Sequence, residues 1–158
     1  MLGVATAFGF VAGLVQTLGF LRWPFLVPYL AQAYLAPGAN EAQRTTAAFV
    51  FEAFHRHLGM GVGEHLGYLS TSIWTLLIMV RTAFVPRWFG VMGVVLAIGI
   101  AAGLGEPVGW DLGGTINAPC YLGWSVCLIA CGVILIFRAG GVTMSPSANT
   151  PIPHGATI

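Results

Sequence analysis

The sequence predicts an all-α integral membrane protein with four transmembrane helices and a short interfacial or re-entrant helix after the first. The chain has 158 residues, of which 57% are hydrophobic and only 7% are charged. An average soluble domain carries about 25% charged residues. So few charges cannot cover the surface of a soluble domain. Four stretches approach the roughly 20 apolar residues that cross about 30 Å of hydrocarbon, so we expect the lipid bilayer to be the solvent.

The first predicted span, residues 2–21, carries no charge and is followed by Arg22, Trp23 and Pro24. Tryptophan is typical of the membrane interface, and proline breaks a helix. We therefore expect the first helix to stop there. The next segment, 25–35, is apolar but too short to cross, so it is expected to lie at the interface or to re-enter the membrane.

A turn and a long helix follow. Pro37-Gly38 predicts the turn, and Asn40 can cap a helix that continues without proline to Val80. The second predicted span is the apolar part of this helix, residues 58–80. Everything from about 25 to 57 is therefore expected at or outside the interface.

Two further spans complete the predicted bundle. Residues 88–105 form an uncharged, glycine-rich span, and 119–137 form the last one. The acidic, glycine-rich stretch 106–118 between them is expected to be a loop. Residues 1–138 thus form one helical membrane domain. The tail 139–158 is rich in Gly, Ser, Thr and Pro and is expected to be disordered.

The distribution of arginines gives little evidence for the orientation of the chain in the membrane. In a four-span arrangement three arginines fall on each side of the membrane: Arg81, Arg87 and Arg138 against Arg22, Arg44 and Arg56. Short loops carry the positive-inside signal better than long connectors. We expect the short loop 81–87 and the C-terminus in the cytoplasm. The chain has no lysine and no basic cluster, so a nucleic-acid partner is not expected.

One face of the second span is polar. At about 100° per residue, its polar side chains fall in a stripe about 100° wide, with His65 at the edge. The stripe comprises His57, Glu64, Tyr68, Thr71, Ser72 and Thr75.

The adjoining face is built from small residues, Gly59, Gly63, Gly67 and Ser70. Such a pattern lets another helix approach closely. This helix is therefore expected inside a bundle rather than facing lipid.

Glu64 is the main functional candidate, because a carboxylate near hydrocarbon must be paired, protonated or open to water. It could form a structural hydrogen bond with Tyr68 or His57. Alternatively, it marks a site for a proton, an ion, a cofactor or a substrate. In that case the candidate catalytic residues are Glu64, His57, His65 and Tyr68, with His57 and His65 as candidate cofactor ligands.

No metal centre is expected. The H-E-x-x-H spacing is absent, and His57 and His65 lie about 12 Å apart along a helix. A haem or pigment needs only one histidine per helix, so it stays an alternative. Cys120, Cys127 and Cys131 share a face of the last span, either as packing residues or as soft ligands for Cu(I).

Two blocks, LGFLRWPFLVPYLA (18–31) and VFEAFHRHLGMGVGEHLGYLSTSIWTLL (50–77), resemble an uncharacterised bacterial multi-span membrane family, domain of unknown function 4386. The likeness covers roughly residues 2–137 and corresponds to the C-terminal four spans of that family. It implies an integral protein of the bacterial inner membrane and further helices upstream in longer members. It implies no activity, substrate or cofactor.

Three functions are therefore open. The residues favour a small membrane protein that associates with other membrane helices, as a homo- or hetero-oligomeric subunit or scaffold, rather than an enzyme. The first alternative is a membrane enzyme, or a protein that binds haem, a pigment or a metal, using His57, Glu64 and His65. The second is a small proton-coupled transporter lined by the polar stripe.

Overall fold

The computed structural model describes residues 2–79 and 86–142. Within these ranges the backbone forms helices and turns and no strand. The chain divides into two compact units, residues 1–125 and 126–158, which are described separately.

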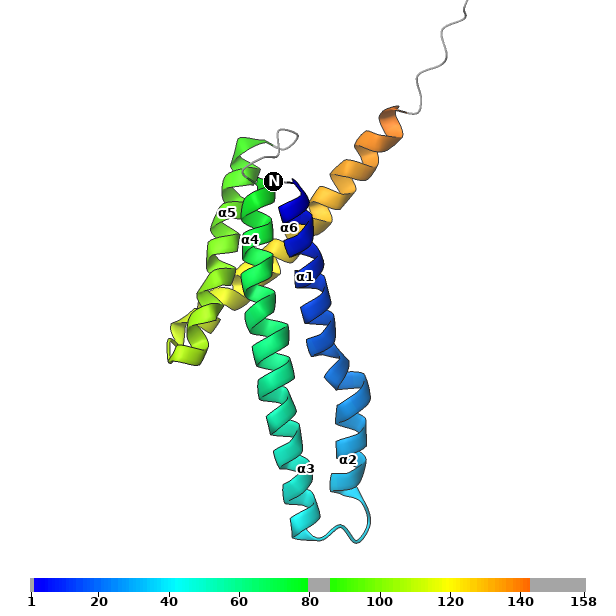
Figure 1. Ribbon diagram of the computed structural model, residues 1–158. Helices are drawn as coiled ribbons and strands as arrows, with labels where there is room; N and C mark the ends of the chain where they lie inside the picture. The colour runs from blue at the N-terminus through cyan, green and yellow to red at the C-terminus, as the bar shows by residue number, and fades with distance from the viewer. Residues whose placement is uncertain (1, 80–85, 143–158) are drawn as a thin grey trace, which may run out of the picture. The chain divides into compact units, whose positions relative to one another are not determined.

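The first helix does not stop at Pro24. Instead, α1 (Leu2–Leu21), the π-helical turn η1 (Arg22–Leu26) and α2 (Val27–Leu35) form one continuous helix of 34 residues (Figure 1). The prediction of a separate short helix after the first span is therefore wrong. A π-turn and a neighbouring donor can satisfy the carbonyl that a proline leaves unpaired, so a helix in a membrane protein can continue through it.

The chain reverses at Pro37-Gly38, as predicted, and Gly38 has a φ of +88°, which glycine adopts without strain. The Asn40 side chain then accepts a hydrogen bond from the Gln43 backbone N–H at 2.9 Å. The Gln43 side chain accepts one from the Asn40 backbone N–H at 3.0 Å. This capping box confirms the predicted helix start.

The returning helix is also continuous. It comprises α3 (Glu41–Phe54), the π-helical segment η2 (His55–Leu66) and α4 (Gly67–Met79). The predicted uninterrupted helix is confirmed over the described residues. It lies antiparallel to the first: α1 contacts η2 and α4, and α2 contacts α3 (Figure 1).

The third helix, α5 (Arg87–Ala102), begins after Pro86 and packs against α4. It continues into the 3₁₀ turn η3 (Gly103–Val108), which ends at Gly109 with a φ of +90°. The predicted span 88–105 is therefore helical.

The last helix, α6 (Leu112–Val142), contains the predicted span 119–137 but begins well before it. The prediction of a loop through residue 118 is wrong. A Cβ at Gly114 would overlap the Glu106 side chain, so glycine here allows a close approach that composition alone does not reveal. Residues 139–142 are helical rather than disordered, and the rest of the predicted tail lies outside the described residues.

Three helical stretches in the described ranges are long and apolar enough to cross a membrane. They are Leu2–Leu35, Arg87–Val108 and Leu112–Phe137. The predicted second span, 58–80, is not among them, because Glu64, His65 and a run of hydroxyl side chains make it less apolar. An all-helical membrane protein is thus supported, with three of its helices clearly suited to spanning.

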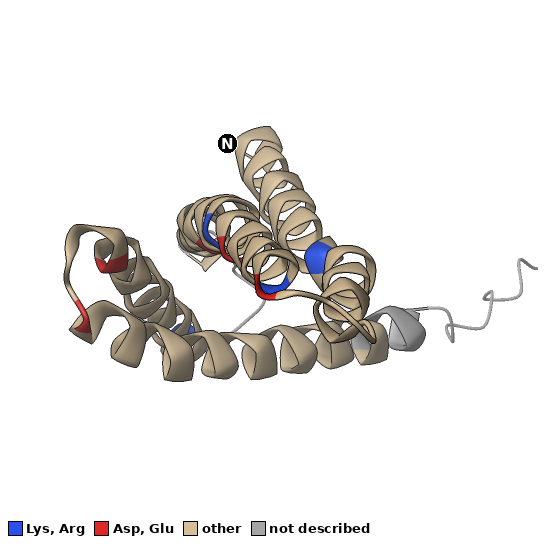
Figure 2. Cartoon of the chain, turned by 90° about the horizontal axis from the view of Figure 1, so that it is seen from below, with Lys and Arg blue, Asp and Glu red and all other residues tan. Residues whose placement is uncertain are grey.

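The interior of the 1–125 unit is polar along α4. Its buried side chains there are Ser70, Thr71, Ser72 and Thr75. Of the predicted polar stripe on α4, Thr71, Ser72 and Thr75 are therefore buried, whereas Tyr68 is half-buried. α1 and α4 carry no charged residue, and the acidic residues Glu106 and Asp111 lie around the turn between α5 and α6 (Figure 2).

Candidate functional site

The small-residue face of η2 and α4 packs directly on α1. A Cβ placed on Gly19 would lie 2.7 Å from the Cα of Gly63, so the two backbones touch. One turn further on, a Cβ on Gly67 would lie 3.0 Å from the Cγ of Gln16. The predicted close helix contact is therefore made within the chain, between its first two helices.

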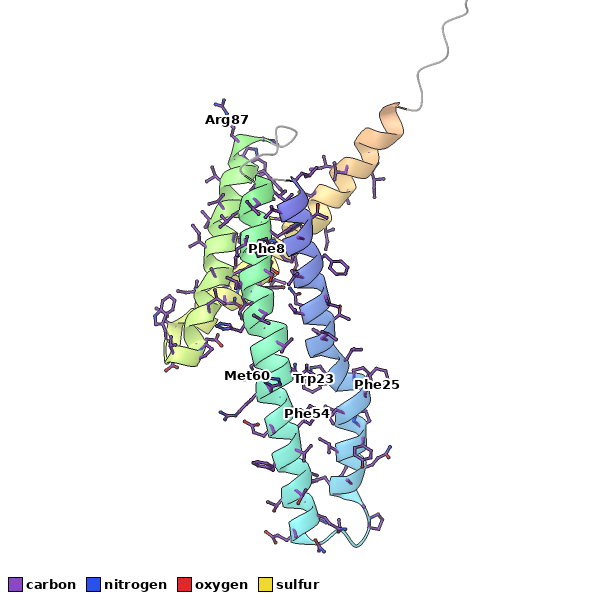
Figure 3. The ribbon with its side chains drawn as sticks, viewed as in Figure 1. Phe8, Trp23, Phe25, Phe54, Met60 and Arg87 are labelled. Carbon is purple, nitrogen blue, oxygen red and sulfur yellow. The ribbon has the colours of Figure 1, made fainter. Side chains whose placement is uncertain are left out.

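Beside this crossing lies Arg22, whose side chain is only 8% exposed. Its Nη1 donates to the Gly19 carbonyl oxygen at 2.9 Å, and its guanidinium lies 5.3 Å from the centre of the Trp23 ring. Figure 3 shows Trp23 directed between the two long helices. A Cβ at Gly59 would overlap the guanidinium, so glycine at 59 makes room for the arginine.

Pro24 lies in the same π-helical turn as Arg22. The backbone bond at the end of this turn runs from the Val27 N–H to the Arg22 carbonyl oxygen. Proline has no N–H, so residue 24 itself donates no backbone hydrogen bond. The Arg22 guanidinium donates to a carbonyl one turn earlier on its own helix, that of Gly19.

Glu64 faces Arg22 from the opposite helix. The Glu64 Oε1 lies 4.0 Å from the Arg22 Nη2, and the carboxylate is 40% exposed. At 4.0 Å the two groups attract each other but do not form a hydrogen bond. The pair is therefore loose on the Arg22 side and partly open on the Glu64 side.

A cavity of about 330 Å³ adjoins this pair. Its walls come from α1 and η1, from η2 and α4, and from the first turns of α6. Polar lining residues are Gln16, Arg22, Glu64, Tyr68, Asn117 and Tyr121. The site thus combines one cation, one anion, two amides and two phenols.

The cavity wall is held by hydrogen bonds between helices. Gln16 Nε2 donates to Thr71 Oγ1 at 2.9 Å. Trp124 Nε1 donates to Thr75 Oγ1 at 2.8 Å. These bonds join α1 to α4 and α4 to the start of α6.

Arg22 is one of four described residues with a buried, unpaired side-chain N or O atom; the others are His55, His65 and Ser72. The Arg22 Nε is fully buried and has no hydrogen-bond partner among the described residues. A buried charged group with an unmade hydrogen bond is costly, and more so near hydrocarbon. Within the described ranges, the Nη2 of the same guanidinium has only the loose contact with Glu64, at 4.0 Å, so a ligand acceptor in the cavity can bind this nitrogen.

The structure brings together two of the four predicted site residues. Glu64 and Tyr68 line the cavity, whereas His57 is exposed, His65 is half-buried, and neither lines it. Arg22, the ion partner of Glu64, was not foreseen as such. The available signal was its place as the first charge after a long uncharged span.

Among the described residues no group of three or more His, Cys, Asp or Glu side chains could hold a metal ion. Cys120 belongs to the 1–125 unit, whereas Cys127 and Cys131 belong to the other, and all three are free. The chemistry that the cavity offers is hydrogen bonding and ion pairing.

Comparison with known proteins gives a family. Over 70 residues the chain is 37% identical to the adenosylcobinamide-GDP ribazoletransferase of Pyrobaculum aerophilum, a stretch that covers 40% of this chain. The chain spans only 31% of that enzyme's length. No solved structure matches the chain. Residues 1–137 match the family described as Domain of unknown function (DUF4386), as the two sequence blocks predicted, and this protein therefore belongs to that family.

Proposed function

We propose that this protein binds a small ligand through an oxyanion or carbonyl group, in the cavity beside Arg22 and Glu64. The observation that carries the proposal is the unsatisfied Arg22. Its guanidinium is 8% exposed, its Nε has no partner among the described residues, and it lines a cavity of about 330 Å³. An acceptor atom on a ligand would hydrogen-bond the Arg22 Nη2, whose only ion partner in the described part of the chain, Glu64, is 4.0 Å away.

Packing inside the chain favours ligand binding over a subunit or scaffold role. The association hypothesis depended on the small-residue face of Gly59, Gly63, Gly67 and Ser70, and this face and other glycines are occupied within the 1–125 unit. A Cβ at Gly9 would meet Trp74 at 2.7 Å, and one at Gly99 would overlap Cys120. Gly63 packs on α1. At these positions the small residues are used within the chain, whereas Gly13, one turn from Gly9, has nothing among the described residues within 4 Å of a Cβ placed there.

The other functions have less support. An enzyme or haem site using His57 and His65 would place its ligands outside the cavity lining. The likeness to a ribazoletransferase spans too little of that enzyme to carry over its activity. Glu64 lines the cavity as a possible acid or base, but neither His57 nor His65 lines it as a second one.

The proposed site would lie at one face of the membrane. We propose four spans, α1, 58–80, 88–105 and 119–137, in a bacterial inner membrane with the C-terminus in the cytoplasm. Twenty residues of helix cover about 30 Å, so the end of α1 at Leu21 reaches the interface opposite its start. Water at this level would solvate the exposed part of Glu64.

The test measures the melting temperature of the purified protein in mild detergent. The probes are inorganic phosphate, acetate and dodecyl phosphate. At least one probe should raise the melting temperature of the native protein, and Arg22→Gln should remove the shift, because glutamine carries no charge. The matched control is Arg56→Gln, since Arg56 is exposed and paired with Glu52. A lack of shift with all three probes, or an equal shift in Arg22→Gln, would contradict the proposal.

A further inference from the structure

We infer that the ligand is an amphiphile with an oxyanion headgroup, and that it enters the cavity sideways from the bilayer. This inference rests on the proposed function and names the class of its ligand. It comes from the distribution of polar and apolar residues between the inner end and the rim of the cavity.

The most buried side chains of the cavity lining are polar, and its exposed side chains are apolar apart from Glu64. Arg22 is 8% exposed and Asn117 is 4% exposed, and both line the inner part. At the rim, Phe20 is 73% exposed, Trp23 is 47% exposed, and Ala118 is exposed as well. A molecule that fits this gradient has a polar head and an apolar chain.

The helices at the rim carry exposed apolar side chains there. On α1, which has no charged residue, the exposed rim side chain is Phe20. On the first turns of α6, Leu122 is 69% exposed. In a membrane protein such surfaces lie against acyl chains. The opening between α1 and α6 therefore leads into lipid, and an apolar chain can lie along it.

The size of the cavity suits a headgroup. About 330 Å³ is near the lower end of the roughly 300–1,000 Å³ of small-molecule sites. The head fits inside, and the chain stays outside in the bilayer.

The charges select the headgroup. A single oxyanion can pair with the Arg22 guanidinium, while Glu64, 40% exposed, keeps its own solvation. Gln16, Asn117 and the two phenols can hydrogen-bond the remaining oxygens and hydroxyls of the head.

The experiment compares phosphate that carries an alkyl chain, as dodecyl phosphate, with inorganic phosphate that carries none. In detergent, dodecyl phosphate should raise the melting temperature of the native protein by about 5–10 °C at a concentration roughly 100 times its dissociation constant. Inorganic phosphate at the same concentration should leave it unchanged. Dodecyltrimethylammonium should also leave it unchanged, because its head is a cation.

The responses to these probes distinguish a failure of the amphiphile inference from a failure of the proposed function. A shift with inorganic phosphate equal to that with dodecyl phosphate keeps the proposed function and overturns the amphiphile. If dodecyl phosphate, inorganic phosphate and acetate all leave the melting temperature unchanged, both proposals fail. A shift with acetate but with neither phosphate probe keeps the proposed function and overturns the amphiphile. A shift with the ammonium amphiphile equal to that with dodecyl phosphate would show nonspecific detergent binding and overturn the inference.

A second pair of variants tests the entrance without touching Arg22. Ala118→Trp places a large side chain at the rim and should reduce the dodecyl phosphate shift by at least half. Leu122→Trp is the control, since Leu122 is exposed one turn further along α6 and does not line the cavity. Both positions are exposed, so both variants should fold, as circular dichroism can check. Equal shifts in the two variants would contradict entry between α1 and α6.

Discussion

At the scale of single residues, the contact between Gly19 and Gly63 shows what a pattern can and cannot predict. The spacing of Gly59, Gly63 and Gly67 predicted a face for close helix packing, and that face packs closely. The pattern could not identify the partner helix, because many helices in a bundle carry small residues. The identity of Gly19 as the contact depends on the register between two helices, which only the folded chain determines.

Gly63→Ala should destabilise the protein by about 1–3 kcal/mol. The added Cβ would lie 2.9 Å from the Cα of Gly19, and a backbone atom cannot move aside without shifting α1. Gly13→Ala is the matched control: among the described residues nothing lies within 4 Å of its Cβ. The control should be neutral or gain up to about 1 kcal/mol of helix propensity. The free energy of unfolding, measured in mixed micelles, distinguishes the two, and equal values would argue against the backbone contact.

Glu64 was recognised from sequence because a carboxylate in an apolar helix needs a partner. Its partner was sought on the same helix, where spacing gives neighbours directly. Arg22 comes from another helix, 42 residues earlier in the chain by the numbering, and no helical periodicity relates the two. The polar stripe identified half of the site, and tertiary packing supplied the other half.

At the scale of elements, proline misled the sequence prediction in two places. Pro24 and Pro119 were each placed at a helix boundary, and both lie within continuous helices. The rule is sound for helices in water, where the freed carbonyl and the steric clash have no compensation. In η1 the π-turn relieves the clash, and Arg22 donates to the carbonyl of Gly19.

Pro24→Ala should keep the helix and weaken the binding site. Alanine restores an N–H and removes the ring clash, so this turn can return to α-helical bonding and shift the backbone that carries Arg22. Displaced from its present position, Arg22 should hold the ligand less well, and the dodecyl phosphate shift should fall by at least half. Far-UV circular dichroism should show no loss of helix. Pro37→Ala, in the turn before α3 and outside the cavity lining, is the control. An unchanged shift in Pro24→Ala would show that the proline does not position Arg22.

At the scale of the whole molecule, helix length conflicts with membrane thickness. The continuous helix Leu2–Leu35 has 34 residues, which span about 51 Å at 1.5 Å per residue. The hydrocarbon core is about 30 Å thick. Because α3 pairs with α2, the hairpin of these two helices should extend beyond the hydrocarbon together. With the proposed orientation, it lies on the face of the inner membrane opposite the cytoplasm.

Single cysteines test this arrangement in a protein whose native cysteines, Cys120, Cys127 and Cys131, are replaced by alanine. Gln32→Cys lies exposed on α2 and should react in intact spheroplasts with a maleimide that cannot cross membranes. Val11→Cys is the control: Val11 is 41% exposed on α1 but should be covered by lipid and react only after detergent is added. Reaction of Gln32→Cys only after permeabilisation would reverse the orientation and leave the hairpin in water. Protection of Gln32→Cys until detergent is added, as for Val11→Cys, would place α2 in the hydrocarbon, and the four-span arrangement would then have to be abandoned.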